Sequence, residues 1–145
     1  MKKIFILGIS LYCLSFVSSC ETLNKLPTNT SGGIFSLNGN WKLTSTTDNH
    51  AEIGTVLTVT PAIASAYVKS LANNSYCYRV NDDVWKSITS VVSGGFNIGY
   101  LAGACNGTAT YKDGQVTVLT NNQIRINTKT IGDANLVQEW TRVTN

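Results

Sequence analysis

Residues 115–128 read QVTVLTNNQIRINT, two runs of alternating side chains on either side of an Asn-Asn pair. In the first run, Val116 and Val118 point to the same face of the predicted strand. In the second run, Ile124 and Ile126 likewise share one face of theirs. Apolar residues at every second position are typical of a strand with one buried face. Asn-Asn suits the turn between such strands, because asparagine tolerates positive φ. The stretch therefore predicts two antiparallel strands joined by a tight turn.

The same rhythm of short runs and turn residues continues on both sides of this stretch. Turns are predicted at Asn38-Gly39, Asn73-Asn74, Asn81-Asp82-Asp83, Gly94-Gly95, Asn106-Gly107, Asp113-Gly114, Asn121-Asn122 and Gly132-Asp133. Many of the intervals are 8 to 12 residues long, which favours an all-β sandwich or barrel. No sustained 3.6-residue period occurs after the N-terminal region.

The runs between these turns predict eight to nine strands with short links, which favours antiparallel neighbours. We place strands over residues 41–45, 54–60, 75–80, 84–90, 96–101, 108–112, 115–120, 123–128 and 136–143. Asp113-Gly114 predicts a type I′ hairpin turn. Residues 64–71 fit either a strand or a short helix. Trp85 and Ile88 differ in parity, so one side chain faces outward or a bulge intervenes.

The N-terminal region resembles the export signal of a bacterial lipoprotein. Lys2 and Lys3 precede an apolar run that is too short for a convincing membrane span, and Val17-Ser18-Ser19-Cys20 resembles a lipobox. The resemblance implies cleavage before Cys20 and lipidation of its thiol, with palmitate-type acyl chains holding the protein to a membrane. The alternatives are an unlipidated signal peptide or an N-terminal anchor helix.

Three segments follow from this interpretation. Residues 1–19 are the signal peptide, residues 20–36 are the lipidated cysteine and a flexible tether rich in Thr, Asn, Ser and Gly, and residues 37–145 are the folded domain. We expect a cell-envelope protein. Residue 21 is Glu rather than the Asp of the inner-membrane retention signal, which favours the outer membrane.

Charge and cysteine content limit the partners of the mature chain. Without Lys2 and Lys3 it holds nine basic and eight acidic side chains, so no basic footprint for nucleic acid is indicated. After Cys13 and Cys20, only Cys77 and Cys105 remain. An exported compartment permits a disulfide between them, which stabilises by about 3 to 4 kcal/mol in the chain-entropy model. Two buried free thiols are the alternative.

The two ends of the domain suggest a family. Gly39-Asn40-Trp41 opens the first predicted strand, and Trp140-Thr141-Arg142-Val143 ends the last. This pattern resembles the lipocalin and fatty-acid-binding superfamily, and more closely the small, mostly uncharacterised lipocalin-like lipoproteins of Bacteroidetes-type bacteria. The resemblance implies a compact antiparallel up-and-down barrel of about eight strands, closed by Arg142 packed on the Trp41 indole.

Residue patterns for catalysis or metal binding are missing from the sequence. His50 is the only histidine, and the remaining cysteines are too far apart for a CxxC pair. No nucleophile elbow, phosphate loop or dinucleotide fingerprint occurs. We therefore expect no enzyme, no metal site and no cofactor.

Two functions remain open. The first is a binding module that carries a small apolar ligand, with Tyr76, Tyr78 and Trp85 as candidate ligand-binding residues. The second is an envelope scaffold, filled by its own side chains, that acts on a protein partner as a subunit, adhesin or inhibitor. For the tryptophans, core packing is the ordinary alternative to a ligand role, and for the tyrosines it is cross-strand packing.

Overall fold

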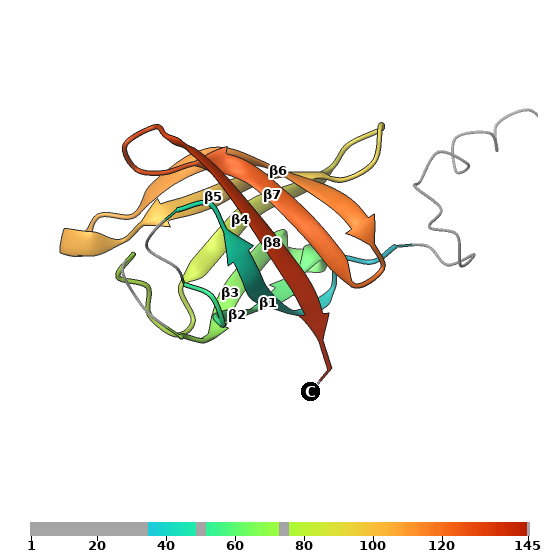
Figure 1. Ribbon diagram of the computed structural model, residues 1–145, viewed down its shortest axis with the longest axis horizontal. Helices are drawn as coiled ribbons and strands as arrows, with labels where there is room; N and C mark the ends of the chain where they lie inside the picture. Colours follow the sequence, from blue (N-terminus) through green and yellow to red (C-terminus); the bar gives the residue numbers. More distant parts are fainter. Residues whose placement is uncertain (1–34, 49–51, 73–75, 145) are drawn as a thin grey trace, which may run out of the picture.

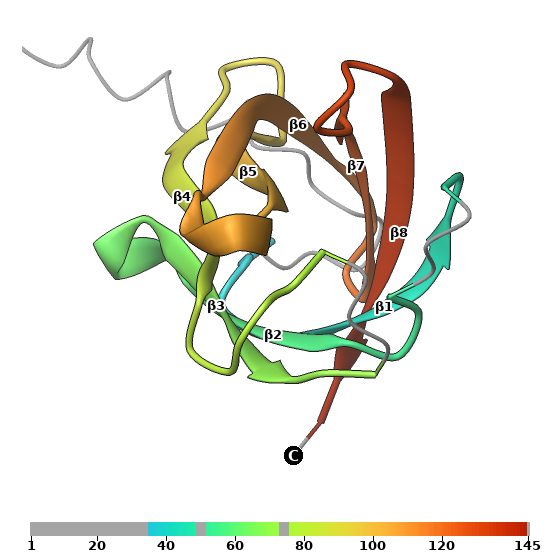
Figure 2. The ribbon, with the colours of Figure 1, turned by 90° about the vertical axis from the view of Figure 1, so that its left-hand side faces the viewer.

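Eight strands form a closed antiparallel barrel in the computed structural model, which describes residues 35–48, 52–72 and 76–144 (Figure 1). The strands are β1 (Gly39–Thr46), β2 (Val56–Thr60), β3 (Ser65–Ser70), β4 (Asp83–Ser90), β5 (Phe96–Gly103), β6 (Thr110–Thr120), β7 (Gln123–Lys129) and β8 (Asn135–Val143). Each strand pairs with the next in sequence, and β8 pairs with β1 to close the ring (Figure 2). The predicted all-β up-and-down barrel is confirmed.

Alternation along the strands fills the inside of the barrel. Buried residues at every second position of β2, β7 and β8 face the core, and polar residues between them face outward. The largest fully buried side chains include Trp41, Trp85 and Tyr100, and Trp140 is 2% exposed. Bulky aromatic residues from β1, β4, β5 and β8 thus occupy the interior of a small barrel.

The predicted hairpin at Asp113-Gly114 is wrong. Both residues lie inside β6, which pairs continuously with β5 on one side and with β7 on the other. Gly114 lets the Ile98 and Thr128 side chains approach the backbone of β6 closely. A Cβ at this position would lie 3.0 Å from Ile98 Cγ1 and 3.4 Å from Thr128 Cβ. The predicted strands 108–112 and 115–120 are therefore one strand.

The predicted strand over residues 75–80 is also wrong over its described part. Residues 76–82 form an irregular loop, and its backbone reaches positive φ at Cys77 and Asn81. Alternate side chains of this segment do not share one buried face, because Tyr78 is 3% exposed and Val80 is 54% exposed. Tertiary contacts, described below, hold this segment and override its strand-like alternation.

Two questions left open by the sequence are answered by local geometry. Residues 64–71 contain strand β3, which follows a short 3₁₀ helix, Pro61–Ile63. In β4 a register shift separates Lys86 from Thr89, with Ser87 at φ 54°. This bulge lets both Trp85 and Ile88 face the core, where they are 0% and 8% exposed.

The chain enters the barrel at Phe35, within the segment expected to be tether. Phe35 is buried, and its ring centre lies 6.3 Å from that of Trp41 and 6.1 Å from that of Phe96. The predicted signal peptide, Cys20 and His50 lie outside the described residues. Within the described ranges, no helix has the length and apolar character needed to span a membrane.

Candidate binding site

The predicted closing pair lies where the first and last strands meet. Trp41 and Arg142 are register partners, and Arg142 Cζ lies 4.3 Å from the centre of the Trp41 ring system. The guanidinium also donates to the carbonyl oxygens of Ser36, Asn38 and Asn121, and the Trp41 indole donates to Leu37 O at 2.8 Å. One side chain thus ties the entering segment, the last strand and the β6–β7 turn together.

The three candidate ligand residues do not gather around one pocket. The Trp85 indole packs inside the barrel, edge-on to Trp140 with ring centres 5.4 Å apart. Tyr76 and Tyr78 belong to the 76–82 loop, and their ring centres lie 5.5 Å apart. Tyr76 donates its backbone N–H to Glu52 Oε1 at 3.1 Å and its hydroxyl to Asp48. These bonds hold the loop over residues 76–82, which we call the tyrosine loop, against Asp48 and Glu52.

A chain of polar groups crosses the core near this loop. Tyr78 donates its hydroxyl to Leu101 O and lies 3.4 Å from the Tyr100 hydroxyl. Gln138 Nε2 donates to Tyr100 Oη at 3.0 Å, and Trp140 Nε1 donates to Gln138 Oε1 at 3.2 Å. Burial raises the pKa of Tyr100 to about 12 and raises that of Tyr78 well above its ordinary value.

Trp85 places a polar group among the aromatic side chains of the core. Its Nε1–H is buried and has no hydrogen-bond acceptor among the described residues. A buried donor without an acceptor costs about 1–3 kcal/mol, so such a group draws attention to what lies beside it.

Cys77 and Cys105 are brought together as a disulfide, with their Cα atoms 5.0 Å apart. The bond joins the tyrosine loop to the short 3₁₀ turn Cys105–Gly107 that follows β5. Ala104 N also donates to Tyr76 O at 2.9 Å. The disulfide therefore fastens the irregular loop that replaces the strand predicted over residues 75–80.

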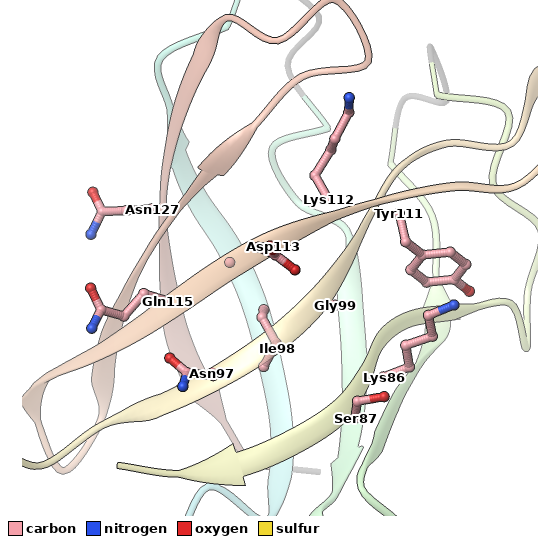
Figure 3. Close-up of a pocket in the computed structure, with 11 residues that line it drawn as sticks. Lys86, Ser87, Asn97, Ile98, Gly99, Tyr111, Lys112, Asp113, Gln115 and Asn127 are labelled. Carbon is pink, nitrogen blue, oxygen red and sulfur yellow. The ribbon is translucent and has the colours of Figure 1, made fainter. Parts of the chain in front are cut away.

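A hollow with a volume of about 690 Å³ lies on the outer face of β4 to β7, and Figure 3 shows the residues that line it. We call it the outer groove. Its floor is Gly99, where a Cβ would lie 3.1 Å from Lys86 Cγ, so the Lys86 side chain runs across the glycine. The Lys86 ammonium lies 3.4 Å from the centre of the Tyr111 ring, and Tyr111 donates its hydroxyl to Asp83 O at 2.7 Å.

Three amide side chains form the other wall of the outer groove. Asn97 on β5 is the register partner of Gln115 on β6, and Gln115 is the register partner of Asn127 on β7. All three are exposed and point to the same side of the sheet (Figure 3). In the described part of the chain, no hydrogen bond engages these three amides. They form a cross-strand row, which we call the amide row.

A second hollow continues beyond Tyr111. It has a volume of about 380 Å³. Its lining includes Arg79 and Asp82 of the tyrosine loop, and Tyr111. The two hollows therefore have Tyr111 in common. The sequence did not predict this region. Its residues are ordinary polar residues at outward positions of separate strands, and only the strand register shows that they are neighbours.

Among the residues that the structure describes, no three His, Cys, Asp or Glu side chains gather closely enough to hold a metal ion.

Fold and surface together define a class: a closed eight-stranded antiparallel up-and-down barrel, compatible with a lipocalin-like fold and with ligand binding. No family model, curated protein or solved structure matches the chain.

Proposed function

We propose that this protein is a lipocalin-like bacterial lipoprotein, of the small Bacteroidetes type, that works through the outside of its barrel rather than as a carrier. The observation that carries this is the contrast between interior and exterior. Trp41, Trp85 and Tyr100 are fully buried in the core, while a hollow of about 690 Å³ lies open on the outer face. A binding role fits a groove whose lining combines three amide side chains and one aromatic ring with two lysines and an aspartate.

The proposed location is the outer membrane, with lipid on Cys20 as the anchor and an envelope partner reached by the outer face. The support is the lipobox-like Val17-Ser18-Ser19-Cys20 after an apolar run. Membrane fractionation of the Cys20→Ala chain tests it. We expect release from the membrane or arrested maturation. A Cys20→Ala chain that stays in the membrane fraction with unchanged mobility contradicts the anchor.

A second candidate is the carrier of a small apolar ligand, and one observation favours it. The buried Trp85 Nε1–H lacks an acceptor among the described residues, and a bound molecule with an oxygen atom inside the barrel would supply one.

Native mass spectrometry of the gently purified chain separates the two functions. A clean apo mass that does not change with fatty acids, haem or quinones supports action through the surface. A reproducible extra mass, lost on extraction with organic solvent, rejects that proposal in favour of the carrier. Trp85→Phe serves as a matched variant, because it removes the unbonded donor and should weaken retention of such a ligand.

A further inference from the structure

We propose that the outer groove binds a neutral oligosaccharide chain. This inference rests on the proposed action through the outer surface and names its ligand class. Four properties of the groove support it: its hydrogen-bonding groups, its charge, its length and the closure of the barrel.

The amide row supplies hydrogen-bonding groups of both kinds. Each amide of Asn97, Gln115 and Asn127 offers a carbonyl that accepts and an NH₂ group that donates. Sugar hydroxyls also donate and accept, so a polyhydroxylated ligand matches this row better than an apolar one does. Adjacent strands are about 4.8 Å apart, so the row presents an amide at each step across the sheet. None of the three is engaged within the described fold.

Charges around the groove argue against an ionic ligand. The Lys86 ammonium lies on the Tyr111 ring, and Lys112 pairs with Asp133 at 2.6 Å. Asp113 adds a carboxylate on the groove side of β6. Positive and negative groups therefore offset one another, and nothing here concentrates charge for a phosphate or a polyanion.

The length of the surface fits a chain rather than a single sugar. The groove of about 690 Å³ and the hollow of about 380 Å³ meet at Tyr111. Tyr111 lines both hollows, so a chain that occupied both would have to pass this residue.

Closure of the barrel separates an oligosaccharide from an extended peptide. Peptides that bind to sheets commonly add a strand to a free edge and use main-chain hydrogen bonds. All eight strands here are paired on both sides, so the described barrel offers no such edge. Recognition on this face must come from side chains, which is the situation that the amide row provides.

Calorimetric titration of the full chain, purified in a detergent without a sugar headgroup, tests the proposal. The probes are neutral hexasaccharides of four linkages: β-1,4-glucan, β-1,3-glucan, α-1,4-glucan and β-1,4-mannan. We expect at least one to bind with a Kd on the order of 1 mM or tighter. The triple variant Asn97→Ala, Gln115→Ala, Asn127→Ala should weaken binding by about tenfold or more.

Two further variants show where binding occurs. Gly99→Val fills the groove floor with a side chain suited to strands and meets mainly the flexible Lys86 side chain, so it should weaken binding by about tenfold without lowering the melting temperature. Thr117→Ala is the matched control: Thr117 lies on the outer face of β6 beside Arg125, outside the groove, and its loss should change the Kd by less than about twofold.

Three results would overturn the proposal: no binding by any of the four probes, binding that the groove variants leave unchanged, or preferential binding of a polar peptide such as residues 21–34 of this chain. None of these results changes the outcome of native mass spectrometry. That measurement alone decides whether the protein acts through its outer surface or carries a ligand inside the barrel. Failure of the oligosaccharide hypothesis is therefore distinguishable from failure of the proposed function.

Discussion

The guanidinium of Arg142 lies over the indole of Trp41, with 4.3 Å between Cζ and the ring centre, and the two residues are register partners on β8 and β1. The barrel is thus closed by a side-chain contact as well as by a strand ladder. Gly39 leaves room for it, because a Cβ there would lie 2.9 Å from Arg142 Nη1.

Replacing Arg142 should weaken the whole barrel. Arg142→Ala removes three bonds to the carbonyls of Ser36, Asn38 and Asn121 together with the indole contact, and we expect a loss of about 3 kcal/mol in the free energy of unfolding, measured with urea. The control is Arg125→Ala, which removes an exposed ion pair with Glu139 and should cost less than about 1 kcal/mol. Equal losses in the two variants would show that the closing contact is no stronger than a surface ion pair.

Gly39→Ala should destabilise the same corner for a steric reason. Gly39 has φ +123°, and an added Cβ also collides with the Arg142 side chain, so we expect a loss of about 2 kcal/mol. Gly132→Ala is the matched control, since its Cβ would find no atom closer than 4.0 Å, and it should change stability by no more than about 0.5 kcal/mol. A thermal shift that is the same for both variants contradicts the role given to Gly39.

Reduction of the Cys77–Cys105 disulfide should lower stability by about 3 kcal/mol, because the bond closes a loop with a sequence separation of 28. The measurement is the melting temperature with and without a reductant. The double variant Cys77→Ala, Cys105→Ala should start at the lower temperature and no longer respond. A wild-type chain indifferent to the reductant would show that the tyrosine loop is held by its other bonds.

Alkaline pH should destabilise the barrel through Tyr100. Its pKa rises from the ordinary value of 10.0 to about 12 on folding, so above pH 10 the unfolded chain loses a proton that the folded chain keeps. The stabilising effect is complete below pH 10 and is lost as the pH rises towards 12, by on the order of 2–3 kcal/mol. Urea unfolding at a series of alkaline pH values measures this, and Tyr100→Phe should flatten the decline. An equally steep decline in the variant assigns it to other groups.

Two tryptophans offer a matched pair. Trp140→Phe leaves Gln138 Oε1 without the bond that Trp140 Nε1 donates, whereas Trp85→Phe removes a donor that bonds to no described residue. We expect Trp140→Phe to cost about 1–2 kcal/mol more in chemical unfolding. The reverse order would show that Trp85 Nε1 has an acceptor after all, such as a ligand or a buried water.

Local pattern was enough to predict the barrel, and tertiary contacts explain where it failed. Strict alternation in residues 123–128 survives in β7 because one face meets the core and the other meets solvent. The predicted turn at Asp113-Gly114 failed because a glycine can serve close packing as well as a bend. The strand over 75–80 failed because the disulfide and the buried Tyr78 hold that segment in an irregular path.

The closing contact was predicted from the resemblance of the two ends of the domain to the lipocalin pattern. The cysteine pair was predicted because only Cys77 and Cys105 remain after Cys13 and Cys20. The outer groove was not. Asn97, Gln115 and Asn127 are distant in sequence, and only the register of β5, β6 and β7 aligns them. A single sequence holds no direct record of register when a strand is long and its outer face is uniformly polar.

The bonds from Arg142 to Ser36 and Asn38 also have a mechanical consequence. On the proposed attachment at Cys20, any drag on the domain enters the barrel through Phe35. The guanidinium holds the chain on both sides of Leu37, so tension reaches this clamp before it reaches the hydrogen bonds between β1 and its neighbours. A barrel tethered in this way would resist peeling from its first strand, and its rupture force in a pulling experiment would depend on one arginine.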